Sequence, residues 1–216
     1  MVKVGVFDSG VGGLSVANAI KKTLPDLEIL VREDKDNLPY GTKSPDQLLA
    51  LVTPILEDMV HNGCSIIVVA CNTVTTTIIG KLREIIEVPL IGMEPMIKPA
   101  AELTKTNVIA VFATPTTLAS DRYNWLKSQY CEKAAVIEPD CSSWSRMIEH
   151  SQVDESQIMT NTLTAITANA DVIVLGCTHY HWIEKLIKQI ADGKATILQP
   201  EVPVIDQLKK VLQQIG

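Results

Sequence analysis

Two cysteines occupy matched places in this chain of 216 residues, each directly after an apolar run that ends in a small residue. Cys71 follows Ile66–Ala70, and Cys177 follows Val172–Gly176. A thiol has a reference pKa of about 8.5, so its neutral and ionised forms are both accessible near neutral pH. A thiolate on one face of a carbon can remove a proton while a thiol on the other face supplies one. The pair therefore predicts the proton transfer that racemisation of an amino acid needs.

Hydrogen-bonding residues follow both cysteines. Asn72 and Thr73 come after the first and enter a predicted helix, whose free N–H groups attract a carboxylate. Thr178 and His179 occupy the corresponding place after the second. Such donors matter because an α-hydrogen is far less acidic than a thiol, so the site must stabilise carbanionic charge and exclude water.

The glycine-rich loop Asp8–Gly13 also follows an apolar run and precedes a predicted helix. It offers a carboxylate and a hydroxyl, although Asp8 could instead cap the helix or do both. Ser15 stands where a dinucleotide-binding GxGxxG motif needs its last glycine, so a dinucleotide site is not expected. A tight strand-to-helix turn remains the alternative interpretation of the loop.

Each candidate also has a purely structural interpretation. A single cysteine at a strand end is more often a small core residue than a catalyst. Two cysteines at matched positions, both flanked by polar side chains, reverse that expectation. A core or loop position is expected for the remaining cysteines, and an ordinary role for the remaining histidines: Cys64, Cys131, Cys141, His61, His150 and His181.

The composition narrows the class of protein. Hydrophobic residues make up 46% and charged residues 20%, and the formal net charge of −6 argues against a nucleic-acid surface. No apolar run is long enough to span a membrane, and the N-terminus has no secretory pattern, so we expect a cytoplasmic protein. Five widely spaced cysteines without a CxxC pair predict free thiols and no metal site.

Short runs rich in Val and Ile alternate with segments of helical period, which predicts an α/β fold with mostly parallel sheets. The predicted strands are 2–8, 27–32, 65–70, 89–92, 108–112, 134–138, 172–176 and 196–198. The predicted helices are 13–23, 45–62, 74–86, 95–103, 118–128, 155–169, 182–191 and 204–215. Ser44-Pro45-Asp46-Gln47 is typical of a capped helix start.

The chain contains an internal repeat. Ile66–Thr73 matches Val172–His179, and Val4–Ser9 matches Ile109–Thr114 at nearly the same offset, close to half the chain length. We therefore expect two similar lobes: residues 1–93 with 205–216, and residues 94–204. Ligands of open α/β sheets bind beyond the carboxyl ends of the strands. Two facing lobes would thus place the two repeated cysteines on opposite walls of one cleft.

Several blocks, in order and spread over nearly the whole chain, resemble the glutamate racemase family, whose members interconvert L- and D-glutamate without a cofactor. The blocks are Phe7–Val16, Pro39–Gly41 with Ser44-Pro45, Ala70–Thr73, Glu94-Pro95 and Gly176–Tyr180. The resemblance implies two lobes related by a pseudo-twofold axis, an active site in the cleft between them, no metal and a homodimer. It also implies a small acidic amino acid as substrate and the supply of D-glutamate for peptidoglycan.

The resemblance further implies the roles of individual residues. The first cysteine of the pair would remove the proton from D-glutamate and the second from L-glutamate. The implied catalytic residues are Cys71, Cys177, Asp8 assisting Cys71, His179 assisting Cys177, and Glu149 orienting His179. The implied substrate-binding residues are Ser9, Pro39, Tyr40, Gly41, Asn72, Thr73, Thr114, Thr117 and Thr178.

Two segments depart from the family pattern. Charged residues fill Arg32–Leu38, where Gly-Asp-Thr-Ala-Arg is usual, and this could change access to the cleft. Cys141–Arg146 lacks the usual prolines and carries the bulky Trp144. Three alternatives to a glutamate racemase stay open on the sequence: an aspartate racemase, a catalytically silent regulator that binds an acidic metabolite, and a thiol hydrolase using one cysteine with His179.

Overall fold

The computed structural model describes residues 2–215, which form two parallel four-stranded sheets. The first sheet has the order β2-β1-β3-β4 and the second the order β6-β5-β7-β8. The strands are β1 (Lys3–Asp8), β2 (Glu28–Glu33), β3 (Cys64–Val69), β4 (Leu90–Gly92), β5 (Val108–Ala113), β6 (Ala135–Ile137), β7 (Val172–Gly176) and β8 (Thr196–Leu198). The predicted α/β class and all eight predicted strands are confirmed, with ends that differ by at most one residue.

Helices cover both faces of each sheet, which explains why the strands are apolar throughout instead of alternating. In β3, Ile67 and Val69 pack toward α2 and α3, whereas Ile66 and Val68 pack toward α1 and α10. The helices are α1 (Gly12–Thr23), α2 (Pro45–His61), α3 (Asn72–Ile85), α4 (Ile97–Leu103), α5 (Pro115–Ala119), α6 (Asp121–Tyr130), α7 (Trp144–Glu149), α8 (Glu155–Thr167), α9 (Glu184–Ala191) and α10 (Glu201–Ile215). Three 3₁₀ turns are η1 (Lys35–Asn37), η2 (Tyr40–Thr42) and η3 (Thr178–Ile183).

Capping chemistry sets several helix ends. The predicted start of α2 is confirmed: the Ser44 hydroxyl accepts the Gln47 N–H, and the Gln47 side chain accepts the Ser44 N–H. The single helix predicted over 118–128 is wrong. Ser120 ends α5 in extended backbone, and its hydroxyl then accepts the Tyr123 N–H at the start of α6. A side chain that can cap a helix favours such a break.

Two further differences lie beside the carboxyl ends of the second sheet. The segment predicted as one helix over 182–191 begins inside η3, and the α-helix proper starts at Glu184. The short helix α7 was not predicted. It forms because Trp144 is fully buried between Phe112 and Tyr180, with ring centroids 5.2 Å from each. Packing against distant residues therefore creates a helix that the local sequence pattern does not predict.

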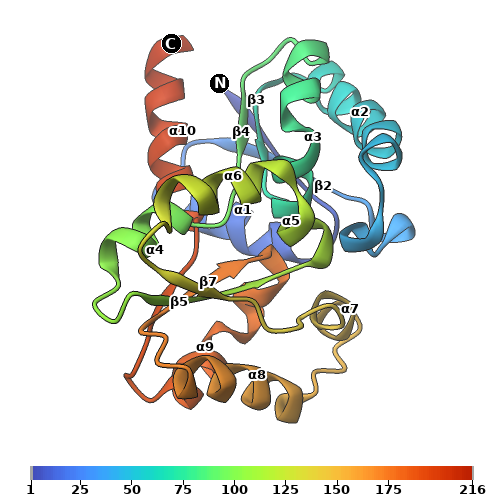
Figure 1. The fold of residues 1–216 in the computed structure, drawn as a ribbon. Helices are drawn as coiled ribbons and strands as arrows, with labels where there is room; N and C mark the ends of the chain where they lie inside the picture. The colour runs from blue at the N-terminus through green and yellow to red at the C-terminus, as the bar shows by residue number, and fades with distance from the viewer. Residues whose placement is uncertain (1, 216) are drawn as a thin grey trace.

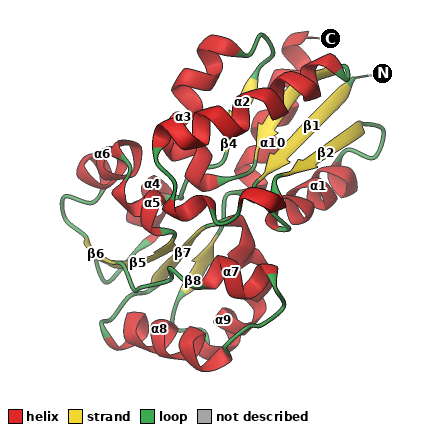
Figure 2. Cartoon of the chain, turned by 90° about the vertical axis from the view of Figure 1, so that its right-hand side faces the viewer, coloured by secondary structure: helices red, strands yellow, loops and turns green. Residues whose placement is uncertain are grey.

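The central strands of each sheet create a crevice at their carboxyl ends. After β1 the chain leads to β2 on one side of the sheet, whereas after β3 it leads to β4 on the other side. The strands β5 and β7 repeat this divergence in the second sheet. Ligand sites form at such switch points. Figure 2 shows the two sheets in separate halves of the molecule, with α5 lying between them.

The C-terminal helix α10 packs on the first sheet, beside the start of the chain (Figure 1). Its residues Val204, Ile205 and Leu208 are buried in one cluster with Val4 and Val6 of β1. We propose on this basis that residues 2–93 with the whole of α10 form the first lobe and residues 94–200 the second, so that the return to the first lobe comes a few residues before the predicted residue 205. No helix in the described part of the chain is long and apolar enough to cross a membrane.

Removing buried side-chain atoms from α10 tests this packing. Leu208 is fully buried, whereas Val202 on the same helix is 66% exposed. We expect Leu208→Ala to lower the free energy of unfolding by about 2–5 kcal/mol, and Val202→Ala by less than about 0.5 kcal/mol. Urea denaturation of the two variants measures the difference, and equal effects would contradict the docking of α10.

Candidate active site

The crevice collects residues from the ends of all four central strands. Asp8 is the last residue of β1, and Cys71 follows β3 and begins α3. In the second half, Thr114 follows β5 and Cys177 follows β7. Because the strands are parallel, their carboxyl ends lie at one edge of each sheet, and the two halves present these edges to each other.

The Cys71 thiol lies in a buried, negatively charged setting. Its Sγ atom lies 3.8 Å from the hydroxyl oxygen of Ser9, to which it donates, and the residue is only 4% exposed. Burial, reinforced by the negative charge of Asp8, raises the pKa of Cys71 to about 12. Cys71 therefore rests as the neutral thiol, a proton donor, at neutral pH.

The Cys177 sulfur lies beside a buried ion pair. Its Sγ is 3.8 Å from Nδ1 of His179, and the Nε2 of the same imidazole is 2.8 Å from Oε2 of Glu149. Burial would lower the pKa of His179, but its hydrogen bonds to Cys177 and Glu149 outweigh burial and raise the pKa to about 10. The hydrogen bond from His179 likewise lowers the pKa of Glu149. An imidazolium beside a sulfur stabilises negative charge that develops on it.

The Asp8 carboxylate is fully buried and accepts bonds from both halves. Its Oδ2 accepts the N–H groups of Gly10 and Gly13, at 3.3 and 2.9 Å, and the Thr178 hydroxyl donates at 3.2 Å. Burial raises its pKa, opposed first by the charge of His179 and then by these donors. Among the described residues Asp8 makes no hydrogen bond to Cys71. It caps the start of α1 and acts on the Cys71 thiol through its charge.

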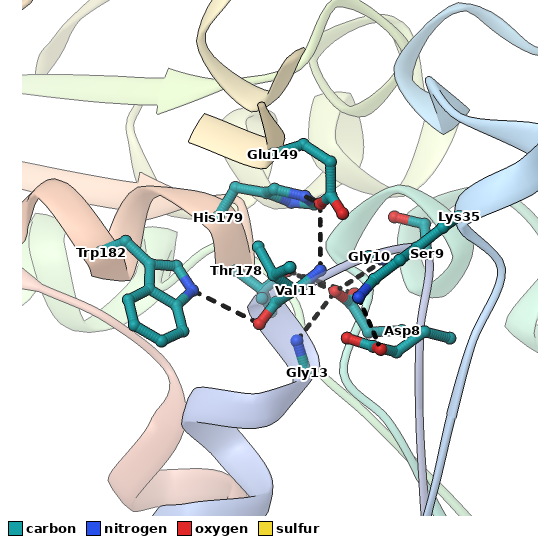
Figure 3. Close-up of polar contacts among 12 residues, drawn as sticks. Asp8, Ser9, Gly10, Val11, Gly13, Lys35, Glu149, Thr178, His179 and Trp182 are labelled. Carbon is teal, nitrogen blue, oxygen red and sulfur yellow. Dashed lines mark hydrogen bonds and ion pairs between the residues drawn. The ribbon is translucent and has the colours of Figure 1, made fainter. Parts of the chain in front are cut away.

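The loop after β1 is held by the second half from several directions (Figure 3). The Val11 N–H donates to Oε2 of Glu149 at 3.0 Å, and the Val11 carbonyl accepts from the Trp182 indole at 3.3 Å. Ser15 on α1 lies 3.2 Å from Nδ1 of His181, whose pKa is lowered to about 4 by burial and by the charge of His179. These contacts hold the halves together at the crevice in this closed arrangement.

A cluster of threonines joins the halves on the Cys71 side. The Thr73 hydroxyl lies 3.0 Å from that of Thr114 and 3.3 Å from that of Thr117. The Thr116 hydroxyl donates to the Gly41 carbonyl at 2.5 Å. The wall of the crevice on this side is therefore made of hydroxyl groups that can also reach a polar ligand.

Both thiols line one small cavity at the centre of the crevice. Its lining contains Cys71, Cys177 and ten further residues, Ser9, Leu38, Tyr40, Gly41, Asn72, Thr73, Thr114, Ser145, Thr178 and His179. The cavity volume is about 10 Å³, roughly that of one water, so the halves must separate for an amino acid to enter. Asn72 is 2% exposed, and both polar atoms of its amide lack a hydrogen-bond partner within the described chain. A buried amide without a partner fits a polar ligand.

The remaining predicted site residues lie behind or outside this cavity. Asp8 and Thr117 support it from behind through the hydrogen bonds above. Pro39 and Glu149 line a second, larger cavity next to it. Sequence reasoning missed Leu38, Ser145 and Trp182. Leu38 and Ser145 belong to the segments that depart from the family pattern, and that departure could have pointed to them. No local sequence pattern indicated a functional role for Trp182.

Within residues 2–215 no group of three or more His, Cys, Asp or Glu side chains is arranged to hold a metal ion. The strongest polar constellation is instead the pair of thiols with the imidazole, carboxylates and hydroxyls around them. It can donate a proton on one side of a bound molecule and accept one on the other.

Comparison with known proteins agrees with this geometry. A family model for Asp/Glu/hydantoin racemases matches residues 7–215. The chain belongs to this family. A glutamate racemase of Clostridium botulinum is 38% identical over 215 residues, covering 97% of this chain and 83% of the relative. The expectation that the chain is an isomerase, an amino-acid racemase, is confirmed by such relatives.

Solved structures of the family share the two-lobed fold. Escherichia coli glutamate racemase, in complex with L-glutamate and the activator UDP-MurNAc-Ala, matches with a TM-score of 0.90 at 28% identity, covering 98% of this chain and 82% of that one. The Francisella tularensis enzyme, in complex with D-glutamate, matches with a TM-score of 0.83 at 27% identity, covering 99% and 81%.

A methyl group at Gly12 should force the halves of this racemase apart. A Cβ there would lie 2.4 Å from the Thr178 hydroxyl oxygen and 2.8 Å from the His179 backbone nitrogen. We expect Gly12→Ala to lower racemase activity by about 10²-fold or more, because small misplacements of reacting groups are costly. Gly80→Ala is the matched control, because Gly80 lies on α3 and a Cβ atom there would have no neighbouring atom within 4 Å. Comparable losses in both variants would contradict the close approach at Gly12.

The raised pKa of His179 predicts a pH-dependent contribution to stability. The group binds a proton more tightly in the folded state, so its contribution is complete below pH 6.5 and is lost as the pH rises through about 10. We expect wild type to lose more unfolding free energy than His179→Gln between pH 6.5 and 10. Urea titrations across this range measure the difference, with exposed His150→Gln as control. Parallel curves for wild type and His179→Gln would show that His179 is not held as an imidazolium.

Proposed function

We propose that this racemase interconverts L- and D-glutamate by proton transfer between two thiols. The observation that carries the proposal is that Cys71 and Cys177 line one cavity in opposite electrostatic settings. Racemisation needs one group to accept a proton while another, on the far face, donates one. A neutral thiol beside Asp8 and a sulfur beside the His179 imidazolium supply these two states together.

In the direction from L- to D-glutamate, the Cys177 thiolate removes the α-hydrogen. The electron pair of the broken C–H bond stays on the substrate as carbanionic charge spread into its carboxylate. The Cys71 S–H bond then breaks and delivers its proton to the opposite face. The products are D-glutamate, a thiol at Cys177 and a thiolate at Cys71, which is the starting state for the reverse direction.

Polar groups around the cavity would hold the substrate and stabilise its charge. The N-terminus of α3 presents the N–H groups of Asn72 and Thr73, where a carboxylate is favoured. The unpartnered Asn72 amide and the Thr178 hydroxyl lie at the same cavity. Closure of the halves removes water, which strengthens every one of these interactions.

Glutamate is favoured over aspartate because relatives that are 35–38% identical are named glutamate racemases, and family structures contain L-glutamate in one case and D-glutamate in another. One methylene changes binding in a fitted pocket by about 1–3 kcal/mol. The ratio of kcat/KM for the two amino acids, expected to favour glutamate by about 10-fold or more, decides between them.

The resemblance to glutamate racemases also supports proposals about the location, the metabolic role and the oligomeric state of the protein. We infer that the enzyme acts in the cytoplasm, that it supplies D-glutamate for peptidoglycan and that it forms a homodimer. Light scattering coupled to size-exclusion chromatography tests the last, where the mass of a single chain would contradict it.

Deuterium incorporation tests the reaction itself. In deuterated water, we expect L-glutamate to gain deuterium at the α-carbon and to yield D-glutamate, because the proton delivered comes from an exchangeable thiol. Proton NMR and chiral chromatography follow the two changes. Binding of glutamate without exchange would favour a silent regulator and overturn the proposal.

Single cysteine variants test the two-thiol mechanism. Cys71→Ala and Cys177→Ala should each lower racemisation by about 10²–10⁴-fold, the usual contribution of a positioned acid or base. Cys64→Ala and Cys141→Ala are matched controls, since each removes a buried thiol outside the cavity in the same half of the molecule. Racemisation that persists in Cys71→Ala would contradict the two-thiol mechanism. Hydrolysis by that variant would instead favour a hydrolase that uses Cys177 with His179.

A further inference from the structure

A second cavity adjoins the one that contains the thiols and is far larger, with a volume of about 480 Å³. Leu38 and Ser145 line both cavities, so these two side chains form the boundary between them. The larger cavity is open to solvent on its outer side, where Lys35 and Arg146 contribute to its lining. It therefore lies on a path from solvent to the reacting groups.

Cations predominate at the rim of this outer cavity. Arg146 is exposed and makes no ion pair within residues 2–215, so its guanidinium is available to a ligand. Lys35 pairs with Glu33 at 3.0 Å while its side chain remains 48% exposed. The one carboxylate in the lining, that of Glu149, is engaged by His179 and by the Val11 N–H.

The two cations come from different halves of the molecule. Lys35 belongs to η1 before the Pro39–Gly41 turn, and Arg146 belongs to α7. The segments that contain them, Arg32–Leu38 and Cys141–Arg146, both depart from the family pattern. The structure brings both departures to one cavity.

The net charge of the whole protein gives the position of these two cations a functional consequence. A molecule with a net charge of −6 repels an acidic amino acid at long range. A local pair of cations at the mouth of a cleft offsets that repulsion and raises the concentration of anions there. Arginine in particular can bind a carboxylate through two parallel hydrogen bonds.

We propose that the outer cavity is an antechamber that captures the dicarboxylic amino acid through Arg146 and Lys35 before it passes between Leu38 and Ser145 to the thiols. The proposal rests on the proposed function, since it takes glutamate as the substrate. Arg146 and Lys35 then determine capture of the substrate, whereas the chemical step belongs to the inner cavity.

The test measures steady-state racemisation by Arg146→Gln, Lys35→Gln and the double variant at low and high ionic strength. We expect the double variant to raise KM by about 10-fold and to change kcat by less than about 2-fold, because charges at a rim act on association. Added salt should raise the KM of wild type, through screening, more than that of the double variant. Arg146→Lys should restore part of the loss.

Lys185→Gln is the matched control, because Lys185 is an exposed cation on α9, outside both cavities. An unchanged KM in the double variant, or a fall in kcat at constant KM, would overturn the antechamber while leaving the racemase in place. If wild type does not racemise glutamate, the proposed function fails instead. Calorimetric titration with L-glutamate then tests the antechamber separately. The proposal requires that L-glutamate bind more tightly to wild type than to the double variant.

Discussion

The carboxylate of Glu149 is the contact on which the arrangement of the crevice depends. Its Oε2 accepts from His179 in its own half and from the Val11 N–H in the other half. Together with Cys177, this carboxylate raises the pKa of His179, and it also ties the glycine-rich loop across the gap. Because the pair is buried, its electrostatic interaction is stronger than in water, and loss of either partner would leave an uncompensated charge.

That contact also explains why two similar halves do not present two equivalent thiols. The internal repeat places a cysteine after β3 and after β7, but only Cys177 has an imidazolium beside it. Cys71 instead has Ser9 as its partner, and burial, reinforced by the charge of Asp8, raises its pKa and holds it as a thiol. Two similar halves with different charges around their thiols suit the proposed mechanism, which needs an acid on one face of the substrate and a base on the other.

Much of this could be predicted from the chain alone. Continuous runs of Val and Ile marked the strands, because strands covered on both faces need no alternation. The nearly equal offsets of the two repeated pairs of segments indicated two lobes. Because ligands of open α/β sheets bind beyond the carboxyl ends of the strands, the repeat also predicted that Cys71 and Cys177 face one crevice. The helix break at Ser120 was not predicted although its capping bond to Tyr123 is local, whereas helix α7 was not predicted because it depends on partners elsewhere in the chain. Trp144 starts α7 only because Phe112 and Tyr180 form its pocket.

The sequence by itself determined the elements, the repeat and the types of residue able to carry protons, since these follow from local pattern and from side-chain chemistry. Only the tertiary structure decided the protonation of each group, because that depends on burial and on charges from distant segments. It likewise decided that Asp8 caps α1 and bonds Thr178 across the gap, and that Lys35 and Arg146 meet at one cavity. Contacts across the crevice join residues between 41 and 171 positions apart, a separation at which no local pattern carries information.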